Sequence, residues 1–278
     1  MTEPPLLDPH AECTPPSRAQ RLLAVIRRHW IVYSSTFLAN ALPAFLEPVL
    51  FLTALGFGLG SYVADGVHGF PLGAFMGPGA LAMTAMFTAA FETSYGSFVR
   101  LVYQKAYDGM LATPLSVGDV FLGEILWCGC KGVLFTSIVL AVFTVFGGAF
   151  AEWAQLFQWS ALAIPLVGGV CSMLFGALGL HVTSITRNMS NFNFFITGLL
   201  TPMSLFSGMV FPVADLPAGV RQLAYALPLF HVTELNRLLL FGPEHCVDFV
   251  WVCPLYLLVV TPLLSWSGVR VMRKRIVV

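Results

Sequence analysis

Long apolar runs separated by short polar segments dominate this chain. Each run is about 20 residues or longer, enough for a helix to cross a hydrocarbon core of about 30 Å. The pattern therefore predicts an all-α polytopic membrane protein with six transmembrane helices. The predicted spans are about 37–59, 74–95, 121–147, 157–181, 192–211 and 248–269.

Composition supports the same class. Of the 278 residues, 57% are hydrophobic and only 10% are charged, whereas a soluble domain carries about 25% charged residues. The first 17 residues are polar and Pro-rich and lack the apolar core of a signal peptide. We expect residues 1–17 to form a disordered cytoplasmic tail, followed by a single transmembrane domain over residues 18–278.

The distribution of lysine and arginine predicts the orientation. With both termini in the cytoplasm, the inside receives eleven basic residues and the outside only Arg221 and Arg237. Positive residues prefer the cytoplasmic side of short loops. We therefore expect a multi-pass protein of the bacterial inner membrane with both termini cytoplasmic.

Segment 223–241 is apolar enough to resemble a seventh span, but a crossing there would reverse the C-terminal tail. It would also place His231, Glu234 and Arg237 in the bilayer, at roughly 3 kcal/mol for each central charge. We expect a re-entrant or interfacial helical element on the outer side, between the fifth and sixth spans. The three residues recur every three positions and share a helical face, which is either a solvated ion-pair surface or an outer gate.

The segment before the first span has an amphipathic pattern. Apolar residues at helical spacing alternate with arginines, which predicts an interfacial helix or an ordinary juxtamembrane anchor. The apolar positions are Leu22, Ile26, Trp30 and Tyr33, and the arginines are Arg21, Arg27 and Arg28.

Residues 96–120 form a polar loop that the topology places in the cytoplasm. The stretch "SFVRLVYQKAYDGMLATPLS" predicts a short helix followed by a turn, because Pro114 disfavours helical geometry at Thr113. A short amphipathic helix outside the bilayer suits docking into a groove on a partner. A loop helix without a partner is the alternative.

Two stretches resemble the type-two ABC exporter permeases, over about residues 20–275. "YDGMLATPLSVGDVFLGEIL" is similar to the cytoplasmic coupling region of that family. "FSGMVFPVADLPAGVRQLAYALPLFHVTELNRLLL" is similar to the family's element between its fifth and sixth spans.

The resemblance implies a membrane subunit powered by separate ATPase subunits, two of them, which hold ATP and Mg. It implies a second permease copy as a homodimer, with a heterodimer as the alternative. The chain has no G-x-x-x-x-G-K-[ST] motif, so we expect no enzyme activity and no bound cofactor. The implied cargo is first a lipid-modified oligosaccharide and second a hydrophobic drug or antibiotic.

The same resemblance makes 96–120 the coupling loop that sits in a cleft of the ATPase. Six residues are the candidate contacts: Tyr107, Asp108, Leu111, Thr113, Pro114 and Leu115.

Four ionisable residues lie in or beside the predicted spans: Glu47, Glu92, Glu124 and Lys131. Such residues usually face the bundle interior or water. Glu92 and Glu124 flank the coupling loop and have either a structural or a transmission role. Lys131 either extends toward the cytoplasm or pairs with another span, Glu92 being the candidate. Glu47 lines a cargo path or marks a kink at Pro48.

Rival classes find less support in the chain. An ion-coupled secondary transporter needs midplane ion sites and usually internal repeats, and no repeat is visible. A membrane enzyme needs clustered acid–base residues, and the histidines are scattered.

We expect the six cysteines to be apolar packing residues. We leave open whether Cys246 and Cys253 are bonded. We also expect no metal site and no nucleic-acid partner.

Overall fold

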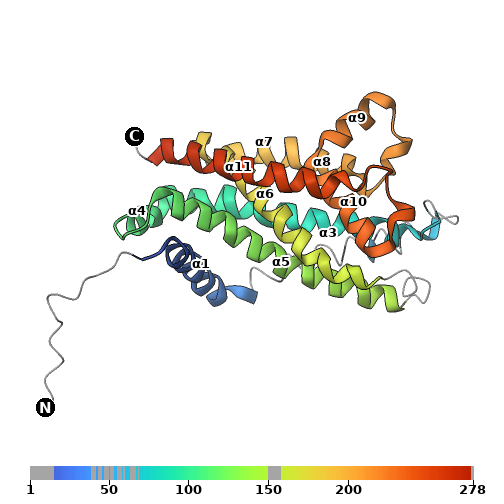
Figure 1. Ribbon diagram of the computed structural model, residues 1–278, viewed down its shortest axis with the longest axis horizontal. Coiled ribbons are helices and arrows are strands. Elements are labelled where there is room, and N and C mark those ends of the chain that lie inside the picture. The colour runs from blue at the N-terminus through green and yellow to red at the C-terminus, as the bar shows by residue number, and fades with distance from the viewer. Residues whose placement is uncertain are drawn as a thin grey trace, which may run out of the picture.

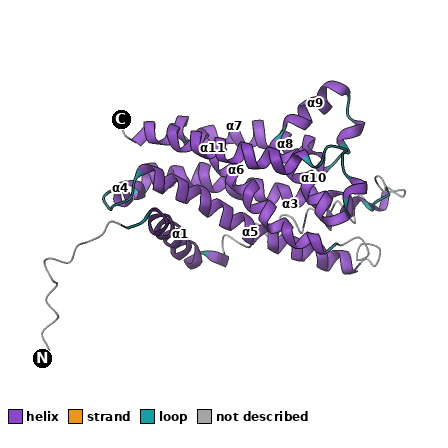
Figure 2. Cartoon of the chain, viewed as in Figure 1, coloured by secondary structure: helices purple, strands orange, loops and turns teal. Residues whose placement is uncertain are grey.

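The computed structural model describes residues 16–38, 69–149 and 158–276, together with isolated positions between 42 and 67. Nearly all of these residues are helical, and no sheet forms among them (Figure 2). Most of the predicted tail 1–17 and of the first predicted span 37–59, including Glu47, lies outside the described residues.

Among the residues that the structure describes, five helical runs are long and apolar enough to cross a membrane. They correspond to the second through sixth predicted spans. Helix α3 (Leu72–Phe91) continues through π-helical turns to Tyr103. The other four runs are α5 (Val117–Ala149), α6 (Ile164–Ile185) with a 3₁₀ turn from Trp159, the run Met189–Met209 containing α7 (Phe192–Phe195) and α8 (Thr201–Ser204), and α11 (Val252–Ile276).

Helix α6 is central and packs against α3, α5 and α11 (Figure 1). Its contact with α5 depends on glycine, since a Cβ at Gly132 would overlap Ser172 and one at Gly168 would overlap Thr136. Small residues let membrane helices approach closely enough for dense packing.

Several helices extend beyond the predicted spans. Helix α3 with its π-helical continuation passes residue 95 because Arg100 finds carboxylate partners inside the bundle. Helix α5 begins at Val117 rather than 121, and Ser116 caps it: its hydroxyl donates to Asp119 at 2.7 Å and accepts from the Asp119 backbone at 3.2 Å. Helix α11 continues to Ile276, so its C-terminal basic residues remain helical.

Helix α1 (Arg18–Ser35) packs on α5 along a face that overlaps the predicted one only in part, since Leu22 and Ile26 are half-buried. Ser17 caps it through reciprocal bonds with Gln20. Its buried residues are Val25, His29 and Tyr33, whereas Trp30 of the predicted apolar face is 52% exposed. His29 can belong to the packed face because its ring faces the Glu124 carboxylate of α5. The hydrophobic pattern of α1 does not indicate this contact.

Segment 223–241 is divided between two helices at the end of the bundle opposite α4 (Ala106–Leu111) (Figure 1). Helix α9 (Ala218–Ala226) ends before Leu227, which is extended ahead of Pro228. Helix α10 (Pro228–Phe241) then packs against α3, α6 and α11. The segment provides no candidate span in the described structure.

Candidate functional site

Helix α4 forms a compact turn at one end of the bundle. The continuation of α3 ends where Lys105 takes a left-handed conformation (φ 49°), which redirects the chain into α4. After α4, the Thr113 hydroxyl donates to the Met110 carbonyl at 2.6 Å. The predicted short helix and turn are therefore present, with the helix confined to Ala106–Leu111.

The six predicted contact residues fall into three groups. Asp108, Thr113 and Pro114 are exposed, and Leu111 and Leu115 are half-buried. Tyr107 is only 1% exposed and packs its ring against Phe121. Helix α4 turns the Tyr107 side chain into the bundle, away from its exposed face, and a contact of Tyr107 with a partner stays a prediction.

Beneath α4, Arg100 joins the two carboxylates that flank the loop. Its Nη1 lies 2.8 Å from Glu92 Oε1, and its Nη2 lies 2.7 Å from Glu124 Oε2. Glu124 is fully buried, and Arg100 and Glu92 are nearly so. Each carboxylate thus has a charge-assisted partner, as buried ions require.

Three more side chains complete what we call the charge cluster: His29, Glu92, Arg100, Tyr107, Glu124 and Lys131. Lys131 Nζ lies 2.8 Å from Glu92 Oε2 and 4.8 Å from the centre of the Tyr33 ring. Of the alternatives for Lys131, the structure has the one that pairs it with Glu92. His29 Nε2 lies 3.1 Å from Glu124 Oε1, and its ring stacks on Trp127.

Tyr107 connects the exposed loop to this cluster. Its hydroxyl donates to Glu124 Oε1 at 2.9 Å. Burial, followed by the nearby Glu124 carboxylate, raises the pKa of Tyr107 well above its usual range. The phenol therefore stays protonated at physiological pH and remains a donor. Through one side chain, the inner face of α4 is tied to the buried end of α5.

We expect Tyr107→Phe to weaken this connection while the ring packing against Phe121 remains. A hydrogen bond to a charged group contributes about 1.5–3 kcal/mol, so the unfolding free energy should fall by that amount. Tyr103→Phe is the matched control, because Tyr103 is 67% exposed at the end of the α3 run, just before α4. Equal thermal unfolding of both variants in lipid nanodiscs would contradict the inference.

Ligand atoms of His29, Glu92 and Glu124 lie within 4.8 Å of one another, a spacing that a metal ion could use. Arg100 and Lys131 already supply positive charge to both carboxylates. An added cation would have to displace them, so the donor set fits an internal ion-pair network better than a metal centre.

A second buried network lies near the opposite end, on α10. Arg237 pairs with Glu234 and donates from Nη2 to the Gly208 carbonyl at 2.9 Å, where the Met189–Met209 run bends at a positive φ. Glu234 Oε2 accepts from the Val247 backbone at 3.1 Å. Both side chains are less than 10% exposed, so the solvated-surface alternative is wrong; packing of α10 among its neighbours removes water.

His231 shares the burial but not the ion pair. Its ring stacks on Tyr256 with centroids 3.9 Å apart, and Nδ1 lies 3.3 Å from Cys253 Sγ. Burial lowers the pKa of His231, which favours the neutral ring.

Cys246 and Cys253 are both free thiols, and burial raises the pKa of Cys246 to about 12.

Sequence reasoning did not place Arg100 or His29 in the charge cluster. A signal for Arg100 existed, because Glu92 precedes it by about two helical turns, and a continued helix brings such residues to one face. For His29 the only signal was its place on the same helical face as Val25 and Tyr33.

Comparison with known proteins adds three relatives. The chain is 35% identical to Nodulation protein J of Sinorhizobium fredii over 222 residues, which are 80% of this chain and 82% of that protein. It is 35% identical to Nodulation protein J of Rhizobium leguminosarum bv. viciae over 229 residues, 82% and 85% of the two chains. It is 24% identical to Inner membrane transport permease YadH of Escherichia coli over 190 residues, 68% and 71% of the two chains.

The apolar helical bundle and these relatives define a membrane transport permease. The chain belongs to the ABC-2 type transporter family, whose model matches residues 20–241. It is the permease subunit of an ABC exporter and not itself an enzyme.

Proposed function

We propose that this permease exports an amphiphilic cargo, a lipid-modified oligosaccharide, from the cytoplasm or inner leaflet. This cargo class is the first one implied by the sequence resemblance, ahead of a hydrophobic drug or antibiotic, and two proteins named for nodulation are among the relatives. Separate ATPase subunits, two per transporter, supply ATP and Mg, and two permease copies form the pathway as a homodimer. Family membership supports an ATP-driven assembly more than an ion-coupled transporter.

The exposed face of α4 is the proposed contact with the ATPase. It presents Asp108, Thr113 and Pro114 to solvent, beside half-buried Leu111 and Leu115. The observation that carries the proposal is the two-sided character of α4: one face is open to a partner, and the other is hydrogen-bonded to buried Glu124 through Tyr107. Movement of a docked ATPase would then reach α5 and, through Arg100, α3.

This proposal is tested by purifying the tagged permease from native membranes and identifying its partners by mass spectrometry. Asp108→Lys with Pro114→Gly should lower ATPase recovery at least about ten-fold, because a reversed charge and a loosened turn both oppose docking. Glu244→Lys, an exposed charge reversal near the other end, should leave recovery unchanged. Recovery of ATPase at wild-type level with the α4 variant would overturn the proposed contact.

The proposed topology has six spans in the bacterial inner membrane with both termini cytoplasmic. Helix α4 lies at the same end as the C-terminal basic turn of α11 (Figure 1), which supports a cytoplasmic position for that end. Helix α1 is then the interfacial helix, and α9 with α10 forms the re-entrant element on the outer side. Residues 1–17 form the cytoplasmic tail, and residues 18–278 form one transmembrane domain.

The Glu234–Arg237 pair is the proposed outer gate, with His231 packed beside it. Arg237 ties α10 to the bend of the Met189–Met209 run at Gly208, so breaking the contact would free two elements together. Glu92, Glu124 and Lys131 have the proposed transmission role through the charge cluster. Glu47 lies outside the described residues, and both of its predicted roles, lining a cargo path or marking a kink at Pro48, stay open.

A further inference from the structure

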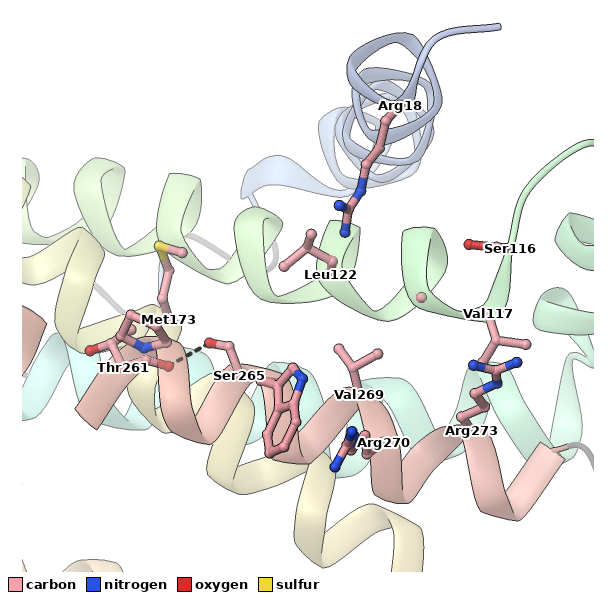
Figure 3. Close-up of a pocket in the computed structure, with 13 residues that line it drawn as sticks. Arg18, Ser116, Val117, Leu122, Met173, Thr261, Ser265, Val269, Arg270 and Arg273 are labelled. Atoms are coloured by element: carbon pink, nitrogen blue, oxygen red, sulfur yellow. Dashed lines mark hydrogen bonds between the residues drawn. The ribbon is translucent and has the colours of Figure 1, made fainter. Parts of the chain in front are cut away.

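A groove of about 670 Å³ runs between α5 and α11, with Arg18 of α1 reaching toward it (Figure 3). Most of its wall is apolar, formed by Leu122 and Met173 on one side and by Pro262, Trp266 and Val269 on α11. A groove of this volume accommodates a drug-sized ligand or a lipid segment. It is lined by none of the charge-cluster residues and by none of the exposed α4 residues.

Three arginines line the groove: Arg270 and Arg273 lie toward the C-terminal end of α11, and Arg18 of α1 lies over Leu122 (Figure 3). Arg270 and Arg273 have no ion-pair partner among the described residues, and Arg270 stacks on Trp266 at 3.7 Å. Arg18 lies 3.9 Å from Asp119, whose other carboxylate oxygen is closer to Arg21 at 3.3 Å. The charges of Arg270 and Arg273 are therefore uncompensated by any acidic side chain in the described part of the chain, whereas Arg18 faces Asp119.

The two kinds of lining are separated along α11. From Pro262 to Arg273 the helix rises about 16 Å, so α11 lines the groove with apolar residues at one end and arginines at the other. These two ends are complementary to an acyl chain and to an anionic headgroup. Trp266 lies between them, and tryptophan favours the membrane–water interface. Basic pockets between transmembrane helices bind anionic lipid headgroups.

We propose that this groove binds an anionic phospholipid. Its phosphate lies among Arg18, Arg270 and Arg273, and one acyl chain lies along Leu122, Met173 and Trp266. Since Arg18 belongs to α1 and the other two arginines to α11, a bound phosphate ties these helices together. The lipid therefore holds α1 in place against the bundle. This inference requires only that the chain lies in a membrane, and it is independent of the cargo.

Two variants distinguish the electrostatic contribution of the arginines to lipid binding from the steric requirement for an open groove. Arg270→Gln with Arg273→Gln removes two charges from the basic end. Gly118→Phe fills the groove without changing charge: a Cβ at Gly118 has ordinary contacts, 3.6 Å from Ser116 Oγ and 4.0 Å from Val269 Cγ1. Arg27→Gln with Lys274→Gln is the matched control, because both residues are exposed and line no part of the groove.

The full-length permease is reconstituted with equimolar phosphatidylglycerol and phosphatidylcholine, and its retained lipid is measured by native mass spectrometry. Wild type should retain phosphatidylglycerol preferentially. The double arginine variant should bind it roughly thirty-fold more weakly, and Gly118→Phe should also lose it, while the control retains it. Thermal unfolding verifies that each variant is folded.

Other outcomes overturn the inference. Equal retention of both lipids would make the groove an apolar site without headgroup selectivity. Displacement by inorganic phosphate alone would identify a phosphate site rather than a lipid site. Full retention by Gly118→Phe would place the lipid on the surface outside the groove.

Discussion

Replacing Arg100 with methionine should destabilise the permease by about 3–5 kcal/mol, since it leaves buried carboxylates without their shared cation. Glu92 would keep Lys131, but Glu124 would retain only His29 and neutral donors. Thermal unfolding in lipid nanodiscs measures the effect. Arg27→Met is the control, because Arg27 is exposed on α1.

A second substitution distinguishes loss of charge balance from loss of packing. In the double variant Arg100→Met with Glu124→Gln, one positive and one negative charge are removed together. The buried Glu92–Lys131 pair remains neutral, so the double variant should be more stable than Arg100→Met alone. If the two substitutions instead destabilise additively, Arg100 and Glu124 do not act as a pair.

Arg237→Met should cost a similar amount, about 3–5 kcal/mol, because Glu234 then stays buried with only the Val247 backbone as a partner. The Gly208 carbonyl also loses its donor, which frees the bend of the Met189–Met209 run from α10. We therefore expect reduced stability together with reduced net export, as a gate that closes poorly lets cargo return.

The control for this prediction is Arg221→Met, which removes a half-buried arginine that donates to the Ala214 carbonyl and has no ion pair among the described residues. Adding Glu234→Gln to Arg237→Met should recover part of the stability, because a neutral side chain can still accept from Val247. Export and unfolding temperature are measured for all variants. An unchanged unfolding temperature for Arg237→Met would contradict the buried-pair account.

The apolar runs made five of the helical spans predictable, because run length alone decides whether a helix can cross a bilayer. The position of α4 was also predictable, from the proline turn at Pro114 that follows it. Pairing of Lys131 with Glu92 was among the alternatives, since a buried cation needs an acidic partner.

Other features depend on tertiary contacts that a hydrophobic pattern does not contain. Arg100 enters the bundle because the α3 run remains helical after the apolar residues end, through π-helical turns that shift its register. Tyr107 turns inward because Lys105 adopts a left-handed conformation just before α4. Glu234 and Arg237 have a surface-like spacing but are buried by α3, α6 and α11.

The central claim, that α4 receives a separate ATPase, is tested most directly by photo-cross-linking in native membranes. A photoreactive residue replaces exposed Thr113 on α4, and a second preparation carries it at exposed Glu244 near the opposite end. The account predicts an adduct with an ATP-binding subunit from position 113 and none from position 244. Absence of that adduct from position 113, or the same adduct from both positions, would contradict it.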